Sequence, residues 1–200
     1  MKTKKNGGMS YVELIVVLSI FFVMTSIILF NYREFQAKVD IKNLASDIAL
    51  KVVEAQKSSL DGKLPLSSHQ PANPAIWKPS YGVYFNTATP KQFIYFTDVD
   101  PVNVLYDGTP SCSGECLDKI TITKNNSISE LKVFGTGCTT NSLNELTIVF
   151  RRPDYRAIMT SNTSNPLCDS ISYAQIIVAS PQSATAANIK IYPSGRIQIN

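Results

Sequence analysis

The first sixty residues carry two apolar patterns in succession. From Met9 to Phe30 the chain is apolar almost without interruption, and Glu13 is the only charged side chain in those twenty-two residues. A helix needs about 20 apolar residues to cross a bilayer. This segment, 9–30, is therefore predicted to be a helix long enough to span a membrane.

The second pattern follows without a helix breaker. Apolar residues recur at steps of three and four, while most charged residues fall between them; this stripe consists of Ala37, Ile41, Leu44, Ile48, Val52 and Ala55. Such spacing places one apolar face along a helix. Asp61-Gly62 ends the pattern, since glycine accepts the left-handed conformation beyond a helix end. We expect one continuous helix from about Ser10 to about Leu60, with residues 31–62 as its amphipathic half.

The remainder, 63–200, changes to short runs rich in Ile, Val, Tyr, Phe and Thr. A proline-containing loop over 63–80 precedes them, and turn residues separate them. The predicted strands are Gly82–Phe85, Gln92–Thr97, Lys119–Thr123, Glu130–Phe134, Glu145–Arg151, Ala157–Thr160, Ala174–Ala179, Asn188–Tyr192 and Arg196–Ile199. The expected fold class is α+β, with the long N-terminal helix packed on an antiparallel β-sheet head.

Charge changes this picture mainly at the N-terminus. Lys2, Lys4 and Lys5 precede the apolar segment, and loss of residues 1–8 would lower the side-chain charge from +4 to +1. Lysines before a membrane segment hold that end in the cytoplasm, so the head is expected outside. A chain so close to neutral does not favour nucleic acid as a partner.

Four cysteines, Cys112, Cys116, Cys138 and Cys168, all lie in the C-terminal half. An even count in an exported chain predicts disulfides. Four cysteines allow three pairings; we favour Cys112–Cys116 with Cys138–Cys168, because the first pair could close a small turn. A zinc site is the competing interpretation, but the C-x3-C spacing and a single histidine match structural zinc poorly.

Glu13 is the most informative residue of the apolar segment. A carboxylate there is costly and indicates function, with a partner of opposite charge. The helix offers no nearby cationic side chain, but an α-amino group created by cleavage upstream would serve. Gly7-Gly8 precede Met9, and a small residue gives a protease close access to the backbone.

These features together resemble the class III signal of type IV prepilins and type II secretion pseudopilins. The resemblance rests on Gly8-Met9-Ser10-Tyr11-Val12-Glu13-Leu14-Ile15-Val16-Val17. It implies that a prepilin peptidase cuts between Gly8 and Met9 and that the Met9 amine is methylated. Phenylalanine is the usual first mature residue in that family, and Met9 is a departure from it. The implied partners are other pilin or pseudopilin subunits, the membrane, an inner-membrane assembly platform and a cytoplasmic ATPase.

Two further features narrow the resemblance. Major pilins often carry a proline at the position of Phe30, whereas this chain has none. The ending Ile189-Lys190-Ile191-Tyr192-Pro193-Ser194-Gly195-Arg196-Ile197 is similar to the closing hairpin of the GspH/FimT group of minor subunits. The expected role is structural: a minor subunit of a type IV pilus or type II secretion pseudopilus, placed first in the cytoplasmic membrane and then in the filament.

DNA binding during natural transformation is the alternative function. Some FimT-type pilins bind DNA through Gly-Arg-x-Arg, which here would involve Arg196 with Lys190 nearby. The matching residues are Gly195-Arg196-Ile197-Gln198, so the second arginine is missing.

Two other kinds of site are weighed and not favoured. Asp98, Asp100 and Asp107 could chelate calcium through carboxylate oxygens, but their spacing does not match an EF-hand and turn-forming aspartates explain them. Catalysis is not expected either, because His69 is the only histidine and no nucleophile–base pair is suggested by spacing.

Overall fold

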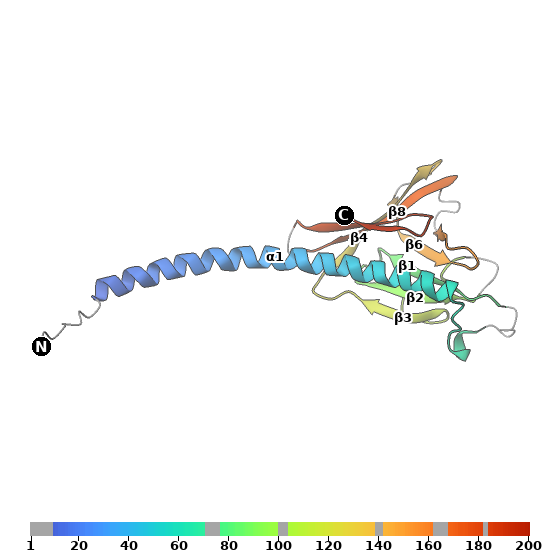
Figure 1. Ribbon diagram of the computed structural model, residues 1–200, viewed down its shortest axis with the longest axis horizontal. Coiled ribbons are helices and arrows are strands. Elements are labelled where there is room, and N and C mark those ends of the chain that lie inside the picture. The colour runs from blue at the N-terminus through green and yellow to red at the C-terminus, as the bar shows by residue number, and fades with distance from the viewer. Residues whose placement is uncertain (1–9, 71–76, 100–103, 139–141, 162–167, 182–183) are drawn as a thin grey trace, which may run out of the picture.

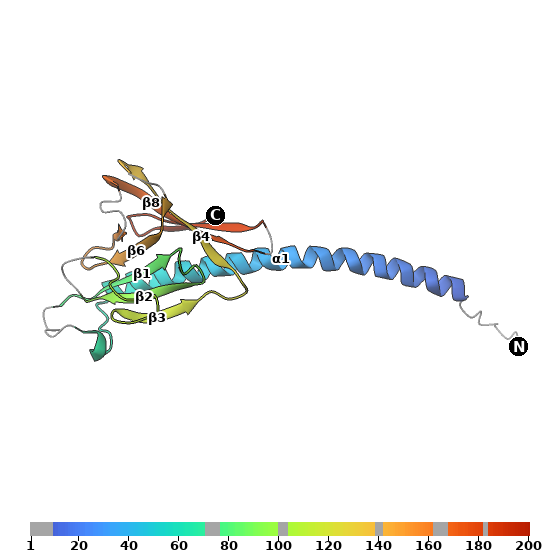
Figure 2. The same cartoon turned by 180° about the vertical axis from the view of Figure 1, so that it is seen from behind.

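The computed structural model describes residues 10–70, 77–99, 104–138, 142–161, 168–181 and 184–200. Its dominant element is one helix, α1 (Tyr11–Leu60), which runs unbroken for 50 residues. At 1.5 Å per residue its length is about 75 Å. Figures 1 and 2 show its N-terminal half standing clear of the head as a gently curved stalk and its C-terminal half lying against the strands.

The helix ends where the sequence predicts. Asp61 is the C-cap, and its N–H donates to the carbonyl of Lys57 at 2.9 Å. Gly62 follows with φ of +61°, a conformation that costs glycine little because it has no Cβ. A single turn of 3-10 helix, η1 (Ser67–His69), lies in the connection to the first strand.

The first sheet contains five antiparallel strands in the order β3-β2-β1-β6-β7. Their bounds are β1 Ser80–Asn86, β2 Gln92–Asp98, β3 Cys116–Thr121, β6 Glu145–Phe150 and β7 Ala157–Thr160. Side chains alternate between its two faces, so β1 and β2 are buried on both.

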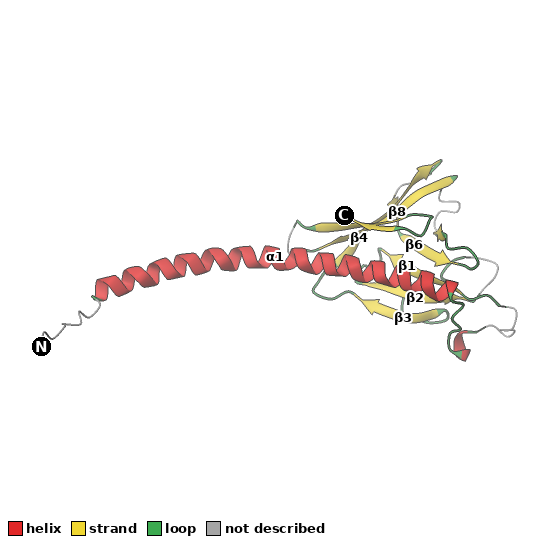
Figure 3. Ribbon diagram, in the orientation of Figure 1, coloured by secondary structure: helices red, strands yellow, loops and turns green. Residues whose placement is uncertain are grey.

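The second sheet has the order β10-β9-β8-β4-β5 and is also antiparallel. Its strands are β4 Ser127–Thr136, β5 Ser142–Leu143, β8 Ser170–Ala179, β9 Ala186–Ile191 and β10 Ile197–Ile199. The α+β class is confirmed, while the head divides its strands between two sheets instead of the single sheet expected. Figure 3 shows these two groups of strands beside the helix.

The main core lies where the inner faces of both sheets meet α1. Five residues of the predicted stripe belong to this core, namely Ile41, Leu44, Ile48, Val52 and Ala55, and each is at most 9% exposed. Ala37, the first residue of the stripe, is buried as well. The helix packs against β1, β6, β8 and β9, and so contacts both sheets. Burial of the second half of α1 thus anchors the helix to the head.

A second, smaller core covers the outer face of the first sheet. Tyr84, Phe96 and Val149 lie there under Tyr106 and Cys116. The segment from Val104 to Cys116 therefore acts as a cover over a sheet face that would otherwise expose aromatic rings to water.

Candidate functional site

The N-terminal half of α1 has no partner within the described chain. Every large apolar side chain from Tyr11 to Leu29 is between 46% and 78% exposed. This helix is the one in the described residues that is long and apolar enough to cross a membrane, and none of its apolar window is buried. A surface of this kind requires lipid or other protein around it.

The hydroxyl groups of this segment are satisfied inside the helix. Ser19 Oγ donates to the carbonyl of Val16 at 2.8 Å, and Thr25 Oγ1 donates to that of Phe21 at 2.8 Å. Ser26 makes the same kind of bond one position further along, at 2.9 Å. Polar groups that are already hydrogen-bonded can enter an apolar environment at reduced cost. The sequence pattern alone did not reveal this compensation.

Glu13 lies in the first turn of α1, exposed on the helix surface. Its Oε2 accepts a weak hydrogen bond from the N–H of Ser10, with a donor–acceptor distance of 3.4 Å. A carboxylate in the first turn also interacts favourably with the positive end of the helix dipole. Among the described residues Glu13 has no ion-pair partner, and Gly8 and Met9 lie outside those residues.

The two cations of the C-terminal hairpin lie over aromatic rings. The Nζ of Lys190 is 5.1 Å from the ring centroid of Tyr173, and the guanidinium carbon of Arg196 is 4.0 Å from that of Tyr192. The two tyrosine rings are 5.7 Å apart, and Tyr173 stacks on Phe134 at 4.7 Å. Phe134 lies on β4 and Tyr173 on β8, and Tyr192 directly follows β9, so both cations are held on one ladder of rings.

The aspartates considered for calcium do not all lie in turns, as the sequence suggested. Asp98 is the last residue of β2 and is 4% exposed, whereas Asp107 is exposed and Asp100 lies outside the described residues. The carboxylate that organises this region is Glu115: its Oε1 accepts from the N–H of Val99 at 2.9 Å, and its Oε2 from that of Asp107 at 3.2 Å. In the described part of the chain, no three His, Cys, Asp or Glu side chains form a group that could hold a metal ion.

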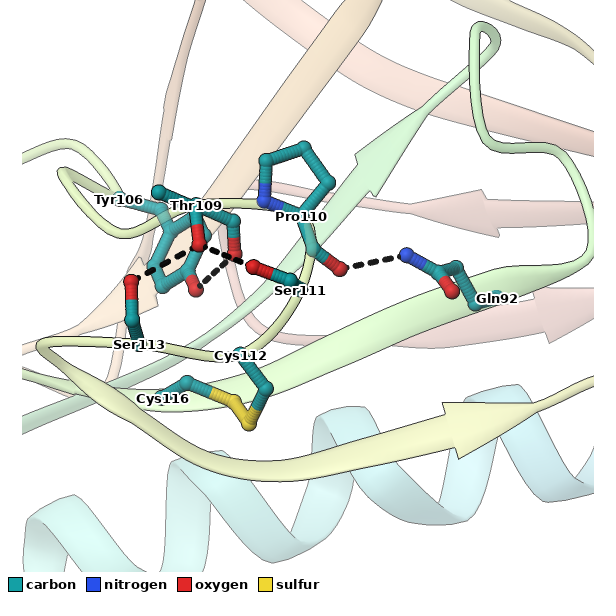
Figure 4. Close-up of a disulfide and its surroundings, with 8 residues drawn as sticks. All are labelled: Gln92, Tyr106, Thr109, Pro110, Ser111, Cys112, Ser113 and Cys116. Atoms are coloured by element: carbon teal, nitrogen blue, oxygen red, sulfur yellow. Dashed lines mark hydrogen bonds between the residues drawn. A yellow bond between two sulfur atoms is a disulfide. The ribbon is translucent and has the colours of Figure 1, made fainter.

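All four cysteines form disulfides, in the pairing that we favoured. Cys112 bonds to Cys116 and Cys138 bonds to Cys168, leaving no thiolate to bind zinc. Around the first disulfide the loop is tied by hydrogen bonds (Figure 4). Tyr106 Oη donates to the carbonyl of Thr109 at 2.9 Å, and Gln92 Nε2 donates to that of Pro110 at 2.6 Å. The disulfide thus closes the cover over the second core.

No family model, no curated protein and no solved structure matches this chain. Its function must therefore be inferred from its own residues and geometry.

Proposed function

We propose that this chain is a minor type IV pilin or pseudopilin, a structural subunit that passes from the cytoplasmic membrane into a filament. The single observation that carries the proposal is the division of α1. Its first half is apolar with none of its apolar window buried, and it has one acid in its first turn, while its second half is anchored in a disulfide-bonded head. A helix of this form can leave lipid only if neighbouring subunits cover its apolar surface.

The proposed contact between subunits joins Glu13 to the Met9 amine of an adjacent chain. Cleavage after Gly8 would create that amine, and a prepilin peptidase is the implied protease. An unpaired carboxylate in an apolar filament core would either neutralise or require an opposite charge. Such a buried pair fixes the axial register of neighbouring subunits, which is the best-attested use of buried ion pairs.

The first experiment replaces Glu13 with alanine in cells that make the filament. We expect leader removal to continue and incorporation into sheared filaments to fall strongly, measured by immunoblotting the filament and membrane fractions. Glu34→Ala is the matched control, because Glu34 is a carboxylate on the same helix and pairs with Lys38 of its own chain at 2.8 Å. Normal incorporation of the Glu13 variant would refute the amine pair.

The second experiment tests the processing site separately. Gly8→Leu should leave residues 1–8 attached when the full chain is co-expressed with a prepilin peptidase, because the bulky side chain obstructs the backbone at the bond to be cut. The control Asn6→Leu adds a comparable side chain away from that bond. Intact-mass measurement separates the two forms, and a normally shortened Gly8 variant would contradict the assignment.

DNA uptake is a second candidate function. The observation that favours it is the shared aromatic ladder beneath Lys190 and Arg196, which presents two cations from one face of the hairpin. Phosphate contacts by such cations weaken steeply as salt rises. The rings of this ladder contact each other and the two cations, so we do not expect nucleic-acid bases to stack on them.

A gel-shift assay across a salt series tests this second candidate with residues 31–200, which exclude the exposed apolar half of α1. Salt-sensitive binding that is lost in Arg196→Ala, but kept in Arg156→Ala, would favour DNA uptake. Absence of DNA binding at low salt would refute the DNA-uptake function.

A further inference from the structure

A groove lies where α1 leaves the head. Phe35, Val39 and Lys42 form its helix side, and Ala187 and Ile199 lie opposite on the strands β9 and β10. In Figures 1 and 2 the C-terminus lies beside α1 at this point. The three helix residues are not part of the buried stripe, so the groove opens on a different face of α1 from the one that packs on the sheets.

The helix side of the groove continues along α1 as a second stripe, which we call the outer stripe. Its members are separated by alternating steps of four and three residues: Phe35, Val39, Lys42, Ser46, Ala49 and Val53. This spacing is typical of the contact seam of a coiled coil. Phe35 and Val53 are 64% and 45% exposed, and none of the six side chains belongs to the main core. Ser46 Oγ donates to the carbonyl of Lys42 at 3.0 Å, so its hydroxyl can enter a helix contact at reduced cost.

The apolar half of α1 has the same spacing on one of its faces. Glu13, Val17, Ile20 and Met24 follow one another at steps of four, three and four residues. The three apolar side chains of this set are between 52% and 62% exposed. A shift of 29 residues superposes the set on the outer stripe, position by position: Glu13 on Lys42, Val17 on Ser46, Ile20 on Ala49 and Met24 on Val53.

We propose that the outer stripe binds the apolar half of α1 from a second copy, with the two helices parallel and displaced by about 44 Å, at 1.5 Å per residue. Ile20 of the second copy then packs on Ala49, and Val17 packs on Ser46. Large side chains thus meet small ones, which lets the two backbones approach closely. The inference rests on the proposed function and names the surface of the neighbouring subunit that covers the apolar half.

The charged pair at the start of this contact sets its register. Glu13 and Lys42 each lack an ion-pair partner among the described residues. At the proposed displacement the Glu13 carboxylate meets the Lys42 ammonium group. A displacement one heptad longer would place Glu13 against Ala49, and one heptad shorter would place it against Phe35. Both alternatives leave two charges unpaired beside apolar side chains, which is costly.

The pair with Lys42 is compatible with the pair between Glu13 and the Met9 amine. An ionised carboxylate has about four acceptor positions. Each helix in a filament has several neighbours, so Glu13 can bind Lys42 of one copy and the Met9 amine of another.

Packing of the apolar halves at the same level is the competing arrangement. It would bring Glu13 beside Glu13 of the other copy, and like charges placed side by side repel. It would also leave Phe35, Lys42 and Val53 of the outer stripe uncovered. An antiparallel contact is excluded, because copies that carry the same lysines before the membrane segment enter the membrane in the same orientation.

The test is oxidative cross-linking of engineered cysteines in cells that overproduce the full chain. All four native cysteines form disulfides, so only the engineered thiols react. Val17→Cys/Ser46→Cys and Ile20→Cys/Ala49→Cys place thiols at facing positions, and both should give covalent dimers in sheared filaments. The matched control Val17→Cys/Val53→Cys uses the same helix faces one heptad out of register and should not give them. Peptide mass spectrometry identifies the joined residues.

Lys42→Glu tests the charged pair within the Val17→Cys/Ser46→Cys chain. It should lower the yield of the 17–46 dimer about fivefold, because it replaces an attraction to Glu13 by a repulsion. Lys119→Glu on β3 makes the same charge change at an exposed position elsewhere on the head and should keep the yield. An unchanged yield in Lys42→Glu would overturn the proposed register.

The outcomes separate this inference from the proposed function. Filaments that contain the chain but yield neither the 17–46 nor the 20–49 dimer would overturn the inference and leave the proposed function standing. Dimers joined only between two copies of residue 17 would also overturn it, in favour of packing at the same level. Absence of the chain from sheared filaments would refute the proposed function itself.

Discussion

The Cys138–Cys168 disulfide provides the sharpest quantitative prediction. It joins the residues just beyond the paired ends of β4 and β8 and has a sequence separation of 30. The Cys112–Cys116 disulfide has a separation of 4. In the chain-entropy account, a disulfide stabilises the fold by restricting the unfolded chain, and the effect grows with the logarithm of the loop length. Removal of the first should cost about 3.7 kcal/mol and removal of the second about 1.9 kcal/mol.

The surroundings of Cys138–Cys168 favour this entropic account. Thr136 and Ser170 are paired in the β4–β8 ladder, and the N–H of Asp169 donates to the carbonyl of Thr136 at 3.0 Å. These backbone contacts already hold the two strand ends together in the folded state. The disulfide therefore acts chiefly on the unfolded chain.

Urea unfolding of residues 31–200 measures both values. The double variants Cys138→Ala/Cys168→Ala and Cys112→Ala/Cys116→Ala are compared with the oxidised protein, and reduced wild-type protein controls for the loss of sulfur packing. The long-loop variant should lose roughly twice as much unfolding free energy as the short-loop variant. Equal losses, or a larger loss for the Cys112 pair, would refute the loop-length argument and assign the stability to the cover over the second core.

Two further predictions concern the head. Ile48→Ala should lower the unfolding free energy by about 2–5 kcal/mol, because the Ile48 side chain is fully buried between α1 and the sheets. The control Leu50→Ala, at a residue that is 64% exposed, should change it by no more than about 0.5 kcal/mol. Similar losses in both variants would contradict the assigned buried face of the helix. Burial raises the pKa values of Tyr84, Tyr95 and Tyr106 to about 12, so the folded state holds these phenol protons more tightly than the unfolded state. The contribution of these three tyrosines to stability should be complete below pH 10 and be lost as pH rises toward 12. Urea unfolding at a series of pH values measures this loss. An unfolding free energy that stays constant between pH 10 and pH 12 would refute the prediction.

Most elements of the fold could be predicted from local pattern. The predicted helix agrees with Tyr11–Leu60, and the strand around Ala157–Thr160 was placed at its observed bounds. β4 and β8 are longer than predicted, because serines and a glycine interrupt the strand-favouring residues at their ends; these are Ser127, Ser129, Gly135, Ser170 and Ser172. These ends adopt strand conformation because β4 and β8 pair with each other along their length. The two-residue strand β5 has too few residues to show a period.

The candidate site was only partly visible in the sequence. The apolar segment and Glu13 could be identified there, because an uninterrupted run and a single acid within it are local features. The groove beside Phe35 could not, since its opposite wall comes from Ile199, far along the chain. The role of Glu115 was missed for the same reason: its carboxylate accepts hydrogen bonds from the backbone of Val99 and Asp107, and no sequence motif marks it.

Local sequence pattern is sufficient to predict the long helix, its division into an apolar and an amphipathic half, and the β-rich character of the head. These properties follow from periodicity and turn residues, which act between near neighbours in the chain. Three features become visible only in the folded chain: the strands form two sheets, both sheets pack on α1, and a groove opens between α1 and the strands β9 and β10. Strand pairing and cavity shape depend on contacts between distant residues, and a local pattern leaves many such pairings open.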